Sequence, residues 1–165
     1  MSTKLALAAG TVALTVGMMP CISHAQVQTQ RDITWKLGLA IAQGAIEACA
    51  KNNIPITVAV VDRAGRVRVF IAPDNPSPHN FELARRKAYT ARTFRIPSGE
   101  FAQRVKDNPT TGQVHLTNII ANQGALPIKV GDDVIGAAGV SGAPGGDKDE
   151  ACVKAGIDKI ADQLK

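Results

Sequence analysis

Hydrophobic residues recur along this chain at the spacing of helices in four places. Asp32 is placed to cap the first of these segments, and Ser77 with Pro78 gives the second a capping hydroxyl and a proline at the first helical position. The pattern predicts four helices, over residues 33–52, 78–94, 98–107 and 148–164.

Runs rich in Val and Ile predict five strands, over residues 56–62, 66–72, 116–121, 126–130 and 134–141. Turn residues at 62–65 and 131–133 join the first two and the last two strands as hairpins. Because hairpins rather than crossovers connect them, the strands form one antiparallel sheet covered by helices. The chain is therefore predicted to be an α+β protein with a single domain over residues 26–165.

Composition agrees with one globular domain. The chain has 165 residues, of which 45% are hydrophobic, 20% charged and 4% aromatic, which excludes collagen, coiled-coil and disordered classes. A net charge of +5 favours anionic ligands. Nucleic acid is not expected as a partner, because aromatic residues are not interleaved with the basic ones.

The first 25 residues have the pattern of a secretory signal peptide. Lys4 precedes an uncharged run from Leu5 to Met19, and small residues at Ser23 and Ala25 fit a cleavage site after Ala25. The run is too short for a membrane span, and Pro20 before Cys21 disfavours a lipid anchor. The mature protein is expected in the periplasm or outside the cell, with no membrane span.

Two cysteines, Cys49 and Cys152, remain after cleavage, each within a predicted helix. In an oxidising compartment they can form a disulfide if the first and last helices pack side by side, worth about 4 kcal/mol in the chain-entropy model. The alternative is that both are small buried apolar residues. A zinc site is less favoured, because the chain lacks the spacing that would supply other ligands.

The segment from Val140 to Asp147, VSGAPGGD, is a glycine-rich loop before a helix. Free N–H groups at such a place can hold a carboxylate or a phosphate, here with Ser141, Gly142, Gly145 and Gly146. The alternative is structural, with Asp147 capping the helix and Glu150 completing a capping box. The loop matches neither a Walker motif nor a dinucleotide fingerprint.

Residues 134–144, VIGAAGVSGAP, and 147–156, DKDEACVKAG, resemble the signature of the GlcG/HbpS family of haem-binding proteins. Residues 56–65, ITVAVVDRAG, resemble that family's first hairpin, and KAYTA at 87–91 resembles its central helix. The resemblance covers nearly all of the mature chain. It implies a profilin-like sandwich with helices on both faces of the sheet, haem as the cofactor and assembly into homo-oligomers.

Known members of the family share no single iron ligand, so the candidates are taken from this chain. Iron accepts His, Tyr, Cys or Met, and all three methionines lie within the signal peptide. His115 is the first candidate for the iron, because it lies between a glycine-containing loop and an apolar strand. Tyr89 and His79 follow, and each has a plain alternative as a surface or partly buried side chain.

The second helix carries its predicted core stripe and many basic residues on the rest of its surface. The stripe comprises Phe81, Ala84, Ala88, Ala91 and Phe94, and the basic residues are Arg85, Arg86, Lys87, Arg92 and Arg95. Arg85 and Arg92 are candidates for binding haem propionates or another carboxylate, and a solvated face is the alternative.

No catalytic triad or zinc-hydrolase motif is present, so a non-catalytic haem protein is the leading interpretation. Asp147, Asp149 and Glu150 are more simply explained by the helix dipole than by metal or acid/base chemistry. The alternative function is a binder or cofactor-independent lyase or isomerase of a small hydroxy acid. The glycine-rich loop would hold the carboxylate, and Lys87 or His115 would move a proton.

Overall fold

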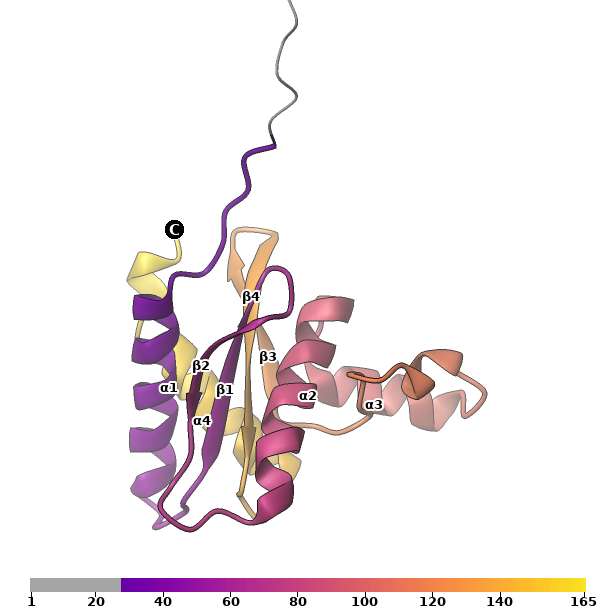
Figure 1. Cartoon of the computed structure of the whole chain (residues 1–165), viewed down its shortest axis with the longest axis horizontal. Helices are drawn as coiled ribbons and strands as arrows, with labels where there is room; N and C mark the ends of the chain where they lie inside the picture. Colours follow the sequence, from indigo (N-terminus) through magenta and orange to yellow (C-terminus); the bar gives the residue numbers. More distant parts are fainter. Residues whose placement is uncertain (1–27) are drawn as a thin grey trace, which may run out of the picture.

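The computed structural model describes residues 28–165, so the predicted signal peptide lies outside the described residues. This part of the chain forms one antiparallel sheet with helices on both of its faces (Figure 1). The elements are α1 (Trp35–Ala50), β1 (Thr57–Asp62), β2 (Val67–Ile71), α2 (Pro78–Phe94), α3 (Ser98–Asp107), β3 (Ala125–Val130), β4 (Asp133–Ser141) and α4 (Gly146–Asp158). Two short 3-10 turns, η1 (Gly112–His115) and η2 (Ala161–Gln163), complete it.

The sheet has the order β2-β1-β4-β3, and each neighbouring pair is antiparallel. Val60 of the central strand β1 lies opposite Val69 of β2 on one side and Ala138 of β4 on the other. All six residues of β1 are buried, whereas β2 at the edge is more open. Strands buried on both faces read as continuous apolar runs, and β1 and β4 do so because helices cover both faces.

Two apolar layers hold the helices to the sheet. On one face, α1 and α4 pack against each other and against Val58, Val60 and Val140. On the other face, α2 packs through small residues on Val61 and Ala137. Gly139 of β4 permits this close approach, because a Cβ there would lie 2.7 Å from the backbone nitrogen of Ala88.

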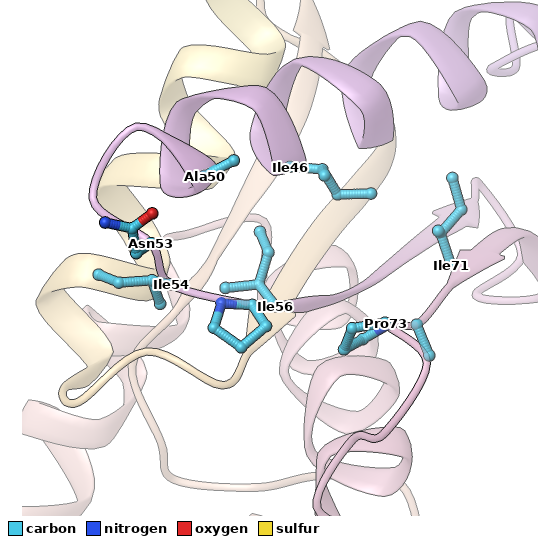
Figure 2. A pocket seen from close by; sticks show the side chains of 9 residues that line it. Ile46, Ala50, Asn53, Ile54, Ile56, Ile71 and Pro73 are labelled. Atoms are coloured by element: carbon cyan, nitrogen blue, oxygen red, sulfur yellow. The ribbon is translucent and has the colours of Figure 1, made fainter.

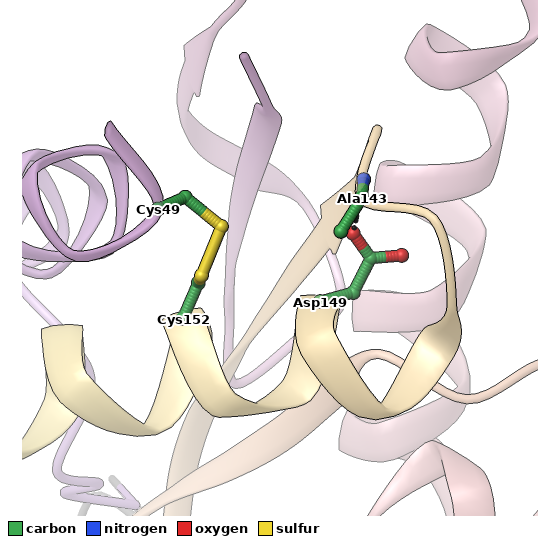
Figure 3. The surroundings of a disulfide bond; sticks show 4 residues. All are labelled: Cys49, Ala143, Asp149 and Cys152. Atoms are coloured by element: carbon green, nitrogen blue, oxygen red, sulfur yellow. Dashed lines mark hydrogen bonds between the residues drawn. A yellow bond between two sulfur atoms is a disulfide. The ribbon is translucent and has the colours of Figure 1, made fainter. Parts of the chain in front are cut away.

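The disulfide between Cys49 and Cys152 is present, with 5.6 Å between the two Cα atoms. It joins the end of α1 to the middle of α4 (Figure 3). The first and last helices do pack side by side, which was the condition for this bond. It closes a loop with a sequence separation of 103.

The sheet has four strands, so the prediction of a fifth over residues 116–121 is wrong. Side chains of α2 bind the backbone of this segment instead: Arg86 donates to the carbonyl of Ile119, and the N–H of Ile120 donates to Thr90. Ile119 is buried, which explains the apolar pattern without a strand. The segment covers a helix rather than extending the sheet.

Helix ends and two side chains of α2 also differ from the predictions. Thr34 rather than Asp32 caps α1, and α4 begins at Gly146 and ends at Asp158. Phe81, predicted in the core, is 59% exposed and packs on Phe70 of β2. Lys87, predicted on the basic surface, is only 2% exposed.

Within residues 28–165 no helix has the length and apolar character that crossing a bilayer requires.

Candidate functional site

A polar pocket lies where the first half of α2, the end of β4 and the loop before α4 meet. Its volume is about 280 Å³, and most of its lining is polar. It is lined by Ser77, His79, Asn80, Leu83, Lys87, Asn122, Ser141, Gly142, Ala143, Pro144, Gly145, Gly146 and Asp149. Six of the predicted site residues are thus brought together here.

The inner wall of the pocket is a buried ion pair between two helices. Lys87 Nζ donates to Asp149 Oδ2 over 2.8 Å and to the carbonyl of Val140 over 3.1 Å. The other carboxylate oxygen of Asp149 accepts the N–H of Ala143 over 2.9 Å, which fixes the glycine-rich loop to α4 (Figure 3). A lysine has three N–H donors, so Lys87 keeps one beyond these two bonds.

Glycine is required at two points around this pair. Gly124 and Gly142 have φ values of +128° and +135°, a region that favours glycine. A Cβ at Gly124 would lie 2.9 Å from Lys87 Nζ, and one at Gly142 would lie 2.7 Å from the carbonyl oxygen of Pro55. The pocket therefore depends on backbone that approaches its charged groups closely.

Ser141 and Asn80 form a second polar contact in the wall. The Ser141 hydroxyl donates to Asn80 Oδ1 over 3.0 Å, and both side chains are buried. Asn80 and Asn122 were not singled out from the sequence. Ser77 was predicted only as a helix cap, and it is the N-cap residue of α2 but makes no side-chain capping hydrogen bond. Asn80 could have been noticed in the sequence as a polar residue on a helix that carries an apolar stripe. Such a residue needs a hydrogen-bond partner when its side chain is buried.

The glycine-rich loop ends in an uncapped helix start. Gly145 is the N-cap of α4 and makes no side-chain capping bond, so the predicted Asp147 cap and its capping box are wrong. The first N–H groups of a helix have no partner within the helix, and its dipole places partial positive charge there. With the remaining N–H of Lys87, this end of the pocket offers hydrogen-bond donors to a ligand oxygen, next to the acidic side chains of Asp147 and Asp149 in the first turn of α4.

Burial shifts the pKa of two carboxyl groups at or next to the pocket. Burial raises the pKa of Asp149, against the opposing hydrogen bond and charge of Lys87. Burial likewise raises the pKa of Glu150, which a hydrogen bond from Gln123 only partly offsets. Glu150 Oε2 is enclosed without a hydrogen-bond partner in the described structure.

The other predicted ligand residues lie outside the polar pocket. His115 is exposed in η1, and Tyr89 is half-buried with its ring close to Gly65 of the β1–β2 turn. Arg85 donates to Asn118 over 2.9 Å, on the segment that covers α2. Arg92 lies in the last turn of α2, away from the pocket.

A second, apolar hollow opens between the end of α1 and the end of β2 (Figure 2). Its volume is about 440 Å³, and its walls include Ile46, Ile54, Ile56 and Ile71. None of its lining residues is a His, Tyr, Cys or Met. Across residues 28–165, no group of three or more His, Cys, Asp or Glu side chains is arranged to hold a metal ion.

The fold and the glycine-rich loop can now be compared with known proteins. The family described as "Haem degrading protein HbpS-like" matches residues 33–158, and the chain belongs to this family. The resemblance seen in the sequence is thereby confirmed.

Three known proteins are similar to this chain over most of their own length. Protein GlcG of Escherichia coli K12 is 27% identical over 115 residues, which cover 70% of this chain and 85% of that protein. The crystal structure of a Streptomyces reticuli HbpS double mutant is 30% identical with a TM-score of 0.77, covering 92% of this chain and 97% of that one. The crystal structure of a PduOC haem complex shares the fold at 22% identity and a TM-score of 0.72, covering 78% of this chain and 95% of that one.

Proposed function

We propose that this protein binds haem after export to the periplasm or the medium, as a homo-oligomer that sequesters, senses or transports it. The observation that carries the proposal is membership of the HbpS-like family over residues 33–158. A haem complex of a protein with the same fold, and the disulfide expected of an oxidising compartment, support it.

The residues of the polar pocket suit one part of haem. His79 supplies an imidazole, which iron accepts, and the N–H groups at Gly145 and Gly146 with Lys87 suit a propionate. The pocket is too polar to enclose the porphyrin, while the apolar hollow carries no iron ligand. The ring would therefore lie outside the pocket, where a second copy of the chain could cover it. When bound, haem would supply its iron for ligation by His79.

The test is a titration with hemin of the chain that begins at Gln26. Binding is monitored by the visible absorption spectrum. A saturable curve with a defined stoichiometry and Soret maximum is expected, whereas a non-saturating response would overturn haem as the ligand. Sizing the complex by light scattering shows whether haem changes the assembly. Sequencing the N-terminus of protein recovered from the periplasm tests cleavage before Gln26.

The second candidate function is binding, or cofactor-independent turnover, of a small hydroxy acid. The observation that favours it is the small polar pocket with a lysine N–H left for a ligand. Lys87 rather than His115 would move a proton, because His115 lies outside the pocket. Calorimetric titration with short 2-hydroxy acids, against the same acids lacking the hydroxyl, separates this function from haem binding. Equal and negligible heats for both sets would reject it.

A further inference from the structure

An arginine-lined hollow lies at the other end of α2 from the polar pocket. Its volume is about 720 Å³, and Arg63, Arg66, Arg92 and Arg95 contribute to its walls beside Asp32. His79 and Arg92 are 13 positions apart in the same helix, which is about 20 Å at the rise of an α-helix. The hollow is therefore a separate place from the pocket described above.

The aspartates around this hollow already have partners. Asp133 accepts from Arg63 Nη2 over 2.5 Å, and Asp62 accepts from Arg66 Nε over 2.9 Å. Asp32 accepts the backbone N–H of Arg63 over 2.9 Å. The three aspartates near the hollow thus already accept hydrogen bonds from Arg63 and Arg66 of the β1–β2 turn.

In the described part of the chain, Arg92 and Arg95 form no ion pair with a carboxylate. Over residues 28–165, neither guanidinium lies within 4.0 Å of a carboxylate oxygen. Residues 1–27 contain no Asp or Glu, so the rest of the chain cannot supply one. The partial negative charge at the C-terminal end of α2 favours cations there. It is smaller than the two full positive charges of these arginines.

Arg92 also has a hydrogen-bond donor without an acceptor. Its Nε is enclosed by the protein and makes no hydrogen bond in the described structure. Burial, together with the like charges of Arg63 and Arg95, lowers the pKa of Arg92, and the nearby charges of Asp133 and Asp32 only partly oppose this. An unmet buried donor is costly, so an acceptor in the hollow that drew the Arg92 side chain toward it would remove this cost.

We propose that the hollow formed by Arg63, Arg66, Arg92 and Arg95 binds a dianionic oxyanion of the phosphate class. Arg92 and Arg95, which form no ion pair within residues 28–165, offer two guanidinium groups to a dianion, and such groups bind phosphate oxygens through paired hydrogen bonds. The ligand is either inorganic phosphate or the phosphate group of a small ester, which share this chemistry. The site does not depend on the proposed haem function.

The test is a thermal unfolding and calorimetric titration with inorganic phosphate, at constant ionic strength and without hemin. Wild-type protein is expected to be stabilised by phosphate beyond an equal ionic strength of sodium chloride. The double variant Arg92→Gln, Arg95→Gln is expected to lose affinity by about tenfold or more. Arg104→Gln is the matched control, because Arg104 is exposed on α3 and paired with Glu100.

Three results would overturn the proposal: no phosphate-specific effect on the wild type, an equal effect on the double variant, or an equal effect of sodium propionate. The last would assign the hollow to carboxylates. The double variant is expected to fold, because it removes like charges that repel each other, and circular dichroism checks this. Titration with a phosphate monoester such as glycerol phosphate then separates the two sources, since an ester that binds tighter than phosphate points to a small ester.

Discussion

Lys87 Nζ and Asp149 Oδ2 lie 2.8 Å apart and join helices that cover opposite faces of the sheet. Lys87 reaches past the end of β4 from α2, and Asp149 meets it from the first turns of α4. Both side chains are at most 4% exposed. The wall of the candidate site is therefore also the point where the two helical layers are tied together.

Replacing Lys87 by Met is expected to lower the free energy of unfolding by about 3–5 kcal/mol, because Asp149 would keep a buried charge without its partner. Urea denaturation at neutral pH measures this. The matched control is Lys154→Met, whose pair with Asp158 is exposed and is worth less than about 1 kcal/mol. Equal losses in the two variants would contradict the assignment of a buried pair.

If the protein binds haem as proposed, comparing His79→Ala with His115→Ala identifies the iron ligand. Both histidines are exposed, but His79 lines the polar pocket whereas His115 lies outside it in η1, so only the first substitution is expected to shift or remove the Soret band. The affinity for hemin is expected to fall with it. A spectrum changed by His115→Ala alone would instead identify His115, the first candidate from the sequence, as the iron ligand.

The pH dependence of stability should depend on Asp62. Burial opposes its ionisation, but hydrogen bonds from Arg66 and Ala64 and the charge of Arg66 outweigh it, so the pKa of Asp62 is lowered from 3.8. A lowered pKa means that its stabilisation is present above pH 3.8 and is lost as the pH falls through the folded-state value. Asp62→Asn is thus expected to be less stable than wild type at pH 7, with the difference shrinking in acid. A difference that is constant across denaturation curves from pH 7 to the acid limit would refute this.

The contact between α2 and β4 should not accept a side chain at Gly139. Gly139→Ala is expected to cost about 1–3 kcal/mol or more, because the new methyl would meet the backbone of α2. Gly112→Ala, where nothing lies within 4 Å of the new Cβ, should stay within about 0.5 kcal/mol of wild type. Thermal unfolding of the two variants side by side decides this, and similar midpoints would mean that the helix can move away at little cost.

Most of the fold followed from local patterns, because hairpin turns and helix starts act within a few residues. The segment 116–121 did not, since only Ile119 of its apolar residues is fully buried and its backbone partners come from Arg86 and Thr90 about 30 positions away. Lys87 could not be placed from the sequence for the same reason. Its partner Asp149 is separated by 62 positions, and only the folded chain brings the two together.

The polar pocket was predicted in part. The glycine-rich loop was recognised because glycine and a helix start are local features. Asn80 and Asn122 were not, because a pocket is a property of three segments meeting at the end of a strand. Tyr89 and Arg92 share a helix with Lys87 but do not line the pocket, because the pocket lies along the first part of α2, and the sequence does not show where along the helix a pocket forms.

The bond between Cys49 and Cys152 also determines what happens if the backbone is cut. Every strand, α2 and α3 lie between these cysteines, as does the exposed loop at residues 108–111. A protease that cleaves this loop would leave two pieces that stay covalently joined and keep their packing. Such a nicked protein would migrate as one band on a gel and separate only after reduction, so in a compartment rich in proteases the molecule can survive a cut.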